Sequence, residues 1–426
     1  MKRIGIIGGG ASGIIAAISA ARSDSHTQVF ILEHKDTIGT KILATGNGRC
    51  NLTNQIMEAT CYHSENISFV EEVLNRFGYQ ATLDFFHSLG LITKSRGNYI
   101  YPRSDQASSV LDLLILELKR LGVQIYTGVH VTKLEKSKRG FRVYTKEQTF
   151  RADKVILACG GKASSALGSD GSGYSLARSM GHSIIPVVPA LVQLKVQKHP
   201  FAKASGVRTD ARVTAYVSGN ELGSDTGELQ ITAYGISGIP VFQISRYIAN
   251  GLYNKQNTEV HIDFLPDITH SEFRDFLFER KNGHEDMYIG DYLTGIFNKK
   301  LIPRLLEQAH IRIQTKVGDL TQKQLQTFVD TCKKTVLTIS DTNGFENAQI
   351  CAGGVCTEEI YSATMESKYV EGLYLTGELL DVDGICGGYN LQWAWATGHL
   401  AGRACASSGH GDTGKKPKTS GKGKRS

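Results

Sequence analysis

A glycine cluster close to the amino terminus constrains the fold of this chain more than any other feature. Gly8, Gly10 and Gly13 have the spacing G-x-G-x-x-G. Residues 2–7 read as a short buried strand before the cluster, and residues 11–22 as a helix of small and apolar side chains after it. In such a unit the first glycine permits a tight turn, the second lets the backbone approach a pyrophosphate, and the third lets helix and strand pack closely. The pattern predicts a Rossmann-type βαβ unit with phosphates at the helix N-terminus.

An acidic residue stands where this unit needs one. Residues 28–32 read as the second strand, and Glu33 follows it about 20 residues after the last glycine, where a carboxylate reaches a ribose diol. A carboxylate also repels a 2′-phosphate, so we expect the adenosine of FAD or NAD and not that of NADP. Ala11 at the helix start and His34 beside the carboxylate are expected contacts of the same nucleotide.

The first 21 residues also resemble a secretory signal, because a basic start precedes an uncharged stretch at residues 4–21. Five glycines in that stretch, each costing about 1 kcal/mol in a helix, favour the nucleotide turn instead. No other stretch approaches the roughly 18 apolar residues of a membrane span. The eight cysteines have neither a disulfide framework nor zinc spacing. We therefore expect a cytoplasmic protein without a membrane span and without a metal site.

The next segment bears on which dinucleotide is bound. Residues 40–54 are polar and rich in glycine, unlike a strand or helix. The side chains in this loop that can satisfy pyrophosphate charge and flavin carbonyls are Lys41, Asn47, Arg49 and Asn51. Cys50 lies where disulfide-reducing flavoenzymes have two cysteines, but no second cysteine accompanies it at that spacing, which speaks against a dithiol mechanism.

Two later strands are expected to meet the cofactor. A strand at 129–133 makes the backbone of Val131 a candidate for adenine contact, and a buried strand at 154–159 ends in Gly160 and Gly161, which bring backbone close to the cofactor. A second glycine-rich segment, residues 168–173, opens a helix but does not directly follow a strand. We therefore do not expect a separate NAD-binding unit there.

The far end of the chain favours FAD. A strand at 372–376 closes with Gly377-Glu378, and the Glu378 carboxylate can bond a ribityl chain. A helix from about residue 391 to 406 follows Asn390, and its N-terminus would point backbone N–H groups at the flavin edge that becomes anionic on reduction. A nicotinamide would not need this late segment, whereas the longer flavin does.

The chain is expected to have an α/β fold in which a Rossmann-like FAD-binding domain is split between both chain ends. The expected boundaries are 1–184 and 346–406 for the FAD domain, 185–265 and 335–345 for an inserted β-rich, barrel-like substrate domain, 266–334 for a helical subdomain, and 407–426 for a disordered basic tail. The net charge is +7, but the tail has six basic residues and one acidic residue, a net of +5, which leaves +2 for the rest. A nucleic-acid reader usually needs a basic face on its folded part, so we expect a small-molecule substrate and no nucleic acid.

Several long motifs carry a family resemblance. They are GIIGGGASG, ATGNGRCNLTN, YPRSDQASSVLD, ACGGKASSALGSDGSGYSLARSMGH, GISGIPVFQISR and GELLDVDGICGGYNLQWAWATG. With these, residues 2 to about 405 resemble the bacterial aminoacetone oxidase family of FAD-binding flavoproteins, whose relatives include a 3-dehydro-bile acid Δ4,6-reductase. The resemblance implies that FAD contacts Ser12, Glu33, Lys41, Arg49, Val131, Glu378, Asp383, Asn390 and Leu391. The segment Thr232-Ala233-Tyr234 departs from the family pattern, in which position 233 is more often polar or charged.

Three functions follow from these features. The first is an FAD-dependent oxidoreductase in which NADH or NADPH reduces the flavin and the flavin reduces an activated C=C bond in a steroid-like or bile-acid-like molecule. The second is a flavin amine oxidase that takes hydride from a substrate such as aminoacetone and produces hydrogen peroxide. The third is a non-catalytic flavin protein whose tail binds RNA or a partner. The catalytic acid is not identified; candidates are Tyr234, Tyr389, Tyr101 and Cys50. The oligomeric state is open.

Overall fold

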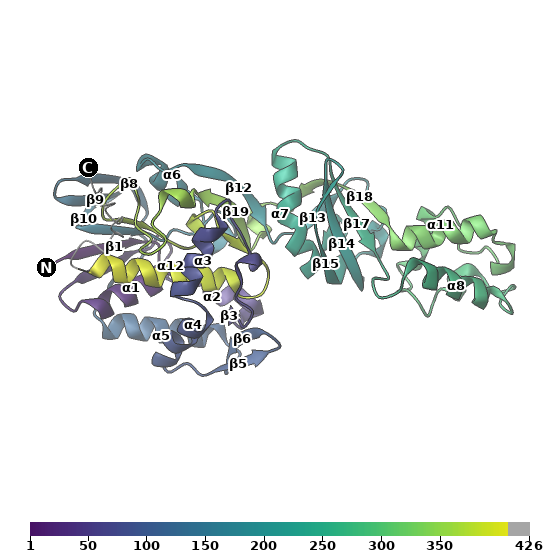
Figure 1. Cartoon of the computed structure of the whole chain (residues 1–426), viewed down its shortest axis with the longest axis horizontal. Helices are drawn as coiled ribbons and strands as arrows, with labels where there is room; N and C mark the ends of the chain where they lie inside the picture. The colour runs from purple at the N-terminus through teal and green to yellow at the C-terminus, as the bar shows by residue number, and fades with distance from the viewer. Residues whose placement is uncertain (408–426) are drawn as a thin grey trace, which may run out of the picture.

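The computed structural model describes residues 1–407. Figure 1 shows an elongated molecule in which both ends of the chain build one lobe, a barrel follows it, and a pair of long helices lies at the far end. The expected tail falls almost entirely outside the described residues.

A five-stranded parallel sheet forms the centre of the first lobe. Its order is β20 (Leu373–Leu375), β11 (Lys154–Leu157), β1 (Arg3–Ile7), β2 (Gln28–Leu32) and β7 (Gln124–Tyr126). The three central strands and β20 are almost wholly buried, as their unbroken apolar runs require in a sheet covered on both faces. The Rossmann-type unit predicted from the glycine cluster is thus present, and the last strand comes from the far end of the chain.

Helices α1 (Ala11–Ser23) and α12 (Tyr389–Ala406) pack closely against each other beside this sheet (Figure 1). Glycine makes the approach possible, because a Cβ on Gly398 would lie 2.3 Å from the backbone oxygen of Ser12. A Cβ on Gly402 would likewise lie 2.3 Å from the backbone oxygen of Ala16. The start and the end of the chain are therefore joined along the length of a helix.

Smaller elements complete the first lobe. They are a sheet of β8 (Val131–Ser137), β9 (Gly140–Thr145) and β10 (Thr149–Ala152), a sheet of β3 (Thr53–Asn54), β5 (Thr93–Arg96) and β6 (Tyr99–Pro102), the pair β4 (Tyr62–His63) and β21 (Asp383–Gly384), and helices α2 (Thr40–Ala44), α3 (Ile67–Arg76), α4 (Tyr79–Ser88), α5 (Ala107–Arg120) and α6 (Ser172–Ser179).

The middle of the chain forms a closed antiparallel barrel with its own apolar core. Its strands, in order around the barrel, are β13 (Leu194–Val196), β16 (Gly235–Ser237), β15 (Asn220–Ile231), β14 (Arg208–Val217), β17 (Thr258–Asp263) and β18 (Thr335–Thr342). Helix α7 (Ile239–Tyr253) packs on the barrel, and helices α8 (His270–Lys281), α9 (Ile289–Tyr292), α10 (Ile302–Gln308) and α11 (Gln322–Lys333) lie between β17 and β18 in the chain. The predicted α/β class with an inserted barrel and helices is confirmed.

One expected strand is divided. Residues 183–196 read as one strand-like segment in the sequence, but the structure has β12 (Ile184–Ala190) and β13, which belong to different sheets. Leu191 lies between them with a φ of +49°, a left-handed conformation that ends the first strand. Strand β12 pairs with β19 (Ile350–Val355), so this two-stranded sheet carries the chain between the lobe and the barrel. None of the helices within residues 1–407 has the length and apolar character needed to cross a bilayer.

Candidate functional site

A cavity of about 530 Å³ lies in the first lobe and reaches the barrel side of the molecule. The turn between β1 and α1 forms one part of its wall, with the end of β2 beside it. The N-terminus of α12 and the segment before it form another part, so residues from both chain ends face the same space.

The glycines of the turn between β1 and α1 have two different structural roles. Gly8 has a φ of +104°, and a Cβ on Gly13 would lie 2.0 Å from the backbone oxygen of Gly8, so these glycines permit the turn and the packing of α1. Gly10 differs, because a Cβ there would meet no atom of the described part of the chain within 4 Å, although the residue lies on the cavity wall. Within the residues that the structure describes, no side chain caps α1, which leaves the first backbone N–H groups of the helix available to an anion.

Glu33 is buried at the end of β2, with its carboxylate on the cavity wall. Its Oε2 accepts a 2.7 Å hydrogen bond from the Gly9 backbone N–H, and its Oε1 accepts one of 2.8 Å from the Lys35 backbone N–H. Burial alone would raise the pKa of Glu33, but hydrogen bonds from His34, Lys35 and Gly9 outweigh it and hold the pKa below the ordinary value. Glu33 is therefore ionised and can accept hydrogen bonds from a diol.

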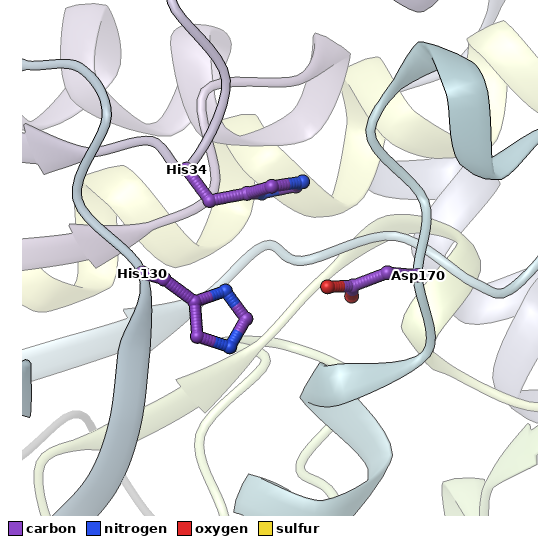
Figure 2. Close-up of side chains that lie close together, drawn as sticks. All are labelled: His34, His130 and Asp170. Carbon is purple, nitrogen blue, oxygen red and sulfur yellow. The ribbon is translucent and has the colours of Figure 1, made fainter. Parts of the chain in front are cut away.

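His34, His130 and Asp170 meet at this end of the cavity. Figure 2 shows the two imidazole rings and the carboxylate turned toward one another from three separate segments, and their ligand atoms all lie within 4.8 Å of each other. Such a donor set suits a transition metal. All three side chains, however, line the same cavity as Glu33, and the Glu33 hydrogen bond raises the pKa of His34. The group therefore lies at the Glu33 end of the cavity, where the sequence analysis expects the nucleoside of the cofactor.

The other end of the cavity combines polar groups from both chain ends. The Lys41 Nζ lies 2.8 Å from the Glu378 Oε2, and the Glu378 Oε1 accepts a 3.0 Å bond from the Cys351 backbone N–H. The Asn51 Oδ1 is buried on the wall and has no hydrogen-bond partner among residues 1–407. Helix α12 begins after Gly388 with no side-chain cap, so its first N–H groups are also available near this point.

These features fit FAD. An open space beside Gly10 accommodates a diphosphate against free N–H groups, and an ionised Glu33 accommodates a ribose. At the far end, the unpaired Asn51 oxygen and the uncapped α12 offer an acceptor and donors for the polar edge of a flavin. A mononucleotide would leave the second set of polar groups without partners.

Most of the predicted cofactor residues lie on this one wall. They are Gly8, Gly10, Ala11, Ser12, Glu33, His34, Lys41, Asn47, Asn51, Val131, Gly160, Glu378, Asn390 and Leu391. The segment at 168–173, which the sequence analysis set aside, also contributes to it through Gly168, Ser169 and Asp170. A glycine-rich segment that opens a helix was the available signal, although no strand precedes it directly.

The other predicted cofactor residues lie outside the cavity wall. Gly13 packs behind the turn, and Gly161 backs the Glu378 carboxylate, which a Cβ would approach to 2.7 Å. Arg49 is exposed and Cys50 is fully buried. The Asp383 carboxylate is turned toward Arg246 of α7, at 2.9 Å from its Nε.

Among the candidate catalytic side chains, Tyr101 lies on the cavity wall. Tyr389 is buried and packs edge-on against the Tyr62 ring, and the Tyr234 hydroxyl accepts a 3.3 Å bond from the Asn343 amide on the barrel side. Burial raises the pKa of the Cys50 thiol to about 12, so it is not a thiolate at neutral pH. Of the three candidate tyrosines, Tyr101 is thus the one that lines the cavity.

An apolar wall faces the barrel side of the cavity. It consists of Leu191 from the link to the barrel, Ile239 and Phe242 from the first turn of α7, Ile350 from β19, and Ile385 and Cys386 from the segment before α12. The sequence analysis expected the inserted barrel-like domain to be the substrate domain but did not identify these residues, because they come from four segments that only the tertiary fold brings together.

The chain resembles known proteins over nearly its whole length. A family model described as HI0933-like protein Rossmann domain matches residues 2–404. The 3-dehydro-bile acid delta(4,6)-reductase of Clostridium scindens is 65% identical over 410 residues, covering 95% of this chain and 99% of that protein. The ribosomal RNA dihydrouridine synthases of Escherichia coli and Haemophilus influenzae are each 30% identical, covering 92% and 94% of this chain and 95% and 96% of those proteins.

Proposed function

The chain belongs to the HI0933-like family of Rossmann-domain proteins, and from that premise we propose that this FAD-dependent oxidoreductase reduces an activated C=C bond in a steroid-like molecule of the bile-acid class. The observation that carries the proposal is the continuity of one cavity, from the ionised Glu33 at its nucleoside end to the apolar wall of Ile239 and Phe242 at its barrel end. A dinucleotide accounts for the first end, and the second is apolar, as a flat hydrocarbon skeleton requires.

The names of the similar proteins support one type of reaction. The name of the 65% identical relative describes reduction of double bonds at positions 4 and 6 of a 3-oxo bile acid. The name of the 30% identical relatives describes conversion of uridine to dihydrouridine. Both reactions saturate a C=C bond that is conjugated with a carbonyl group. Both need a hydride at the electron-poor end of that bond, which is the β-carbon of an enone or the δ-carbon of a dienone, and a proton at a carbon of the resulting enolate. We infer that this chain performs the same type of reduction.

When bound, FAD supplies the hydride from its N5 atom. The chain has to supply or relay the proton, and Tyr101 is the side chain that we assign to this task. It is half-buried on the cavity wall, with the Arg96 guanidinium 5.7 Å from its ring centre. Burial raises the pKa of Tyr101, so the phenol keeps its proton at neutral pH and can donate it.

A stopped-flow experiment under anaerobic conditions tests the proposal on the purified full chain. NADH or NADPH should bleach the flavin absorbance, and a 3-oxo-4,6-diene bile acid should restore it, with the reduced bile acid detected by mass spectrometry. A saturated 3-oxo bile acid is the matched control and should not reoxidise the flavin. Failure of the diene to restore the absorbance would overturn the substrate class. Hydrogen peroxide formed from aminoacetone in air, without pyridine nucleotide, would support an amine oxidase instead.

Reduction of uridine in ribosomal RNA is a second candidate, favoured by the 30% identical relatives. The charge of the chain disfavours an RNA substrate. Residues 1–407 carry a net charge of only +2, whereas a protein that binds RNA needs a basic face. Ribosomal RNA fragments belong in the same reoxidation experiment, and a version of the chain ending at Ser407 separates the contribution of the basic tail. Salt-sensitive RNA binding that disappears with the tail, without flavin reoxidation, would support a binding role for the tail alone.

A further inference from the structure

Helix α7 belongs to the barrel, but two of its side chains hold a segment of the other lobe. The Arg246 guanidinium makes two hydrogen bonds to the Asp383 carboxylate, of 2.9 Å from Nε and 3.3 Å from a terminal nitrogen. One turn earlier, the Gln243 Oε1 accepts a 2.8 Å bond from the Cys386 backbone N–H. These contacts join residues that are 137 and 143 positions apart in the chain.

The segment that α7 holds is part of the site described above. We call residues 381–388 the return segment, because it leads from the last strand of the sheet back to the start of α12. Val382, Ile385, Cys386, Gly387 and Gly388 of this segment lie on the cavity wall. Its backbone is also tied to the start of α12, since the Asn390 side-chain amide makes hydrogen bonds of 2.9 and 2.8 Å with the N–H and the oxygen of Gly384. A shift of the return segment therefore moves both the cavity wall and the helix N-terminus.

The same helix also forms the apolar wall. Ile239 and Phe242, in the first turn of α7, line the cavity. Gln243 and Arg246 of the same helix form hydrogen bonds with the return segment. One rigid helix thus contacts the expected substrate space and the expected flavin edge together. A displacement of about 1 Å between reacting groups costs on the order of a hundredfold in rate, so a direct connection between the two walls has kinetic value.

The ion pair has the properties of a fixed anchor. The Asp383 side chain is 3% exposed and the Arg246 side chain 20% exposed. The planar guanidinium matches both carboxylate oxygens, which a lysine ammonium group cannot do. A buried pair of this kind is weak evidence for a gain in stability, but removal of one partner leaves a buried charge uncompensated, so it strongly favours one arrangement of the two lobes.

We propose that Arg246, assisted by Gln243, is a positioning residue that holds the return segment from the barrel and thereby sets the distance between the apolar wall and the flavin edge. The inference rests on the proposed function for its kinetic meaning, because the distance matters only if a substrate is reduced between those walls. The anchoring itself can be measured without any substrate.

Hydrogen exchange and the visible circular dichroism of bound FAD test the anchoring in the holoprotein. In Arg246→Gln we expect amides of residues 381–388 to exchange about tenfold faster than in the unchanged chain, and the flavin dichroism to change. Arg246→Lys should restore less than half of the lost protection. Arg208→Gln is the matched control, since the pair of Arg208 with Glu228 lies on the same barrel but is exposed, and it should alter neither signal.

Gln243→Leu provides a second variant that keeps the ion pair. It should speed exchange of the Cys386 amide and leave that of Gly384 unchanged, because Gly384 donates to Asn390 within its own lobe. The proposal would be overturned if both Arg246→Gln and Gln243→Leu gave the same result as the control. That result would be amide protection of residues 381–388 and flavin dichroism within twofold of the values for Arg208→Gln. If Arg246→Gln fails to fold, the Cys386 amide in Gln243→Leu decides it in the same way. Loss of anchoring in a protein that does not reduce bile acids would retain this inference and reject the proposed substrate.

Discussion

The Lys41 ammonium group lies 2.8 Å from the Glu378 carboxylate, across 337 residues of sequence. Lys41 lies in α2, soon after the first βαβ unit, and Glu378 follows the last strand of the sheet. Both line the cavity, and their side chains are 27% and 19% exposed. This ion pair therefore links the first and last segments of the FAD-binding lobe at the cavity wall.

Replacement of Lys41 by methionine should weaken FAD binding by about tenfold, because it removes a cation from the wall and leaves the Glu378 carboxylate facing the cofactor without compensation. The dissociation constant can be measured from the fluorescence of released FAD. Lys133→Met is a suitable control, since Lys133 pairs with Glu135 on the surface of the same lobe. An equal loss of affinity in both variants would show that the effect is not specific to the cavity.

Two glycines of the turn should respond differently to alanine. In Gly13→Ala, the new methyl group meets the backbone oxygen of Gly8, so we expect destabilisation of about 3 kcal/mol or more and a lowered melting temperature even without FAD. In Gly10→Ala, the methyl group meets no protein atom and projects into the cavity, so the melting temperature of the FAD-free chain should change little while FAD affinity falls. Thermal unfolding with and without FAD separates the two effects, and equal losses in the FAD-free chain would contradict this division.

Glu33→Ala should reduce FAD retention more than it alters folding. The variant loses a charged acceptor for the ribose, and a hydrogen bond to a charged group is worth about 1.5–3 kcal/mol, so affinity should fall by roughly ten- to a hundredfold. Glu33→Gln keeps the size and one acceptor and should lie between the two. The ratio of flavin to protein absorbance after purification is the measurement, and an unchanged ratio in Glu33→Ala would refute the assignment.

Two half-buried histidines should make the protein sensitive to acid. Burial, with the nearby Arg403 and Arg22, lowers the pKa of His399 to about 4, and burial beside Arg246 lowers the pKa of His63 to about 4. Each histidine binds a proton more readily in the unfolded state, near pH 6.5, so it contributes stability above that pH, which is lost as the pH falls toward 4. The free energy of unfolding should therefore decrease by roughly 2 kcal/mol per histidine across this window.

The acid effect can be assigned with one substitution. His399 stacks on the Phe77 ring with centroids 4.4 Å apart, so His399→Phe retains an aromatic ring while it removes the titrating group. Denaturant unfolding at pH 7 and pH 4.5 should show a smaller difference in this variant than in the unchanged chain. The exposed His26 offers a control through His26→Gln, which should leave the difference unchanged. Identical pH dependence in all three proteins would reject the role of His399.

The spacing of residues in the sequence was sufficient to predict those elements whose contacts lie close together in the chain. The turn from Gly8 to Gly13, the strands around it and the acidic Glu33 are all fixed by residues within one βαβ unit, so their pattern predicts their geometry. The return of the chain to the same site was also predictable, because Glu378 and Asn390 lie in long motifs that suit a flavin edge. The family resemblance and the α/β class with an inserted barrel are confirmed on this basis.

Only the tertiary structure decided how side chains from distant segments face one another. The sequence identifies Asp383 as polar and near the flavin motif, but the position of Arg246 on a helix of the barrel turns its carboxylate away from the cavity. Likewise, the strand-like sequence of residues 183–196 does not reveal the break at Leu191, which arises because the two halves of the segment pair in different sheets. Periodicity records how a residue relates to its neighbours in the chain, whereas burial and pairing depend on groups more than a hundred positions away. The amino-acid sequence alone thus determined the dinucleotide turn and the class of fold, and packing between the lobe and the barrel determined the shape of the cavity at its apolar end.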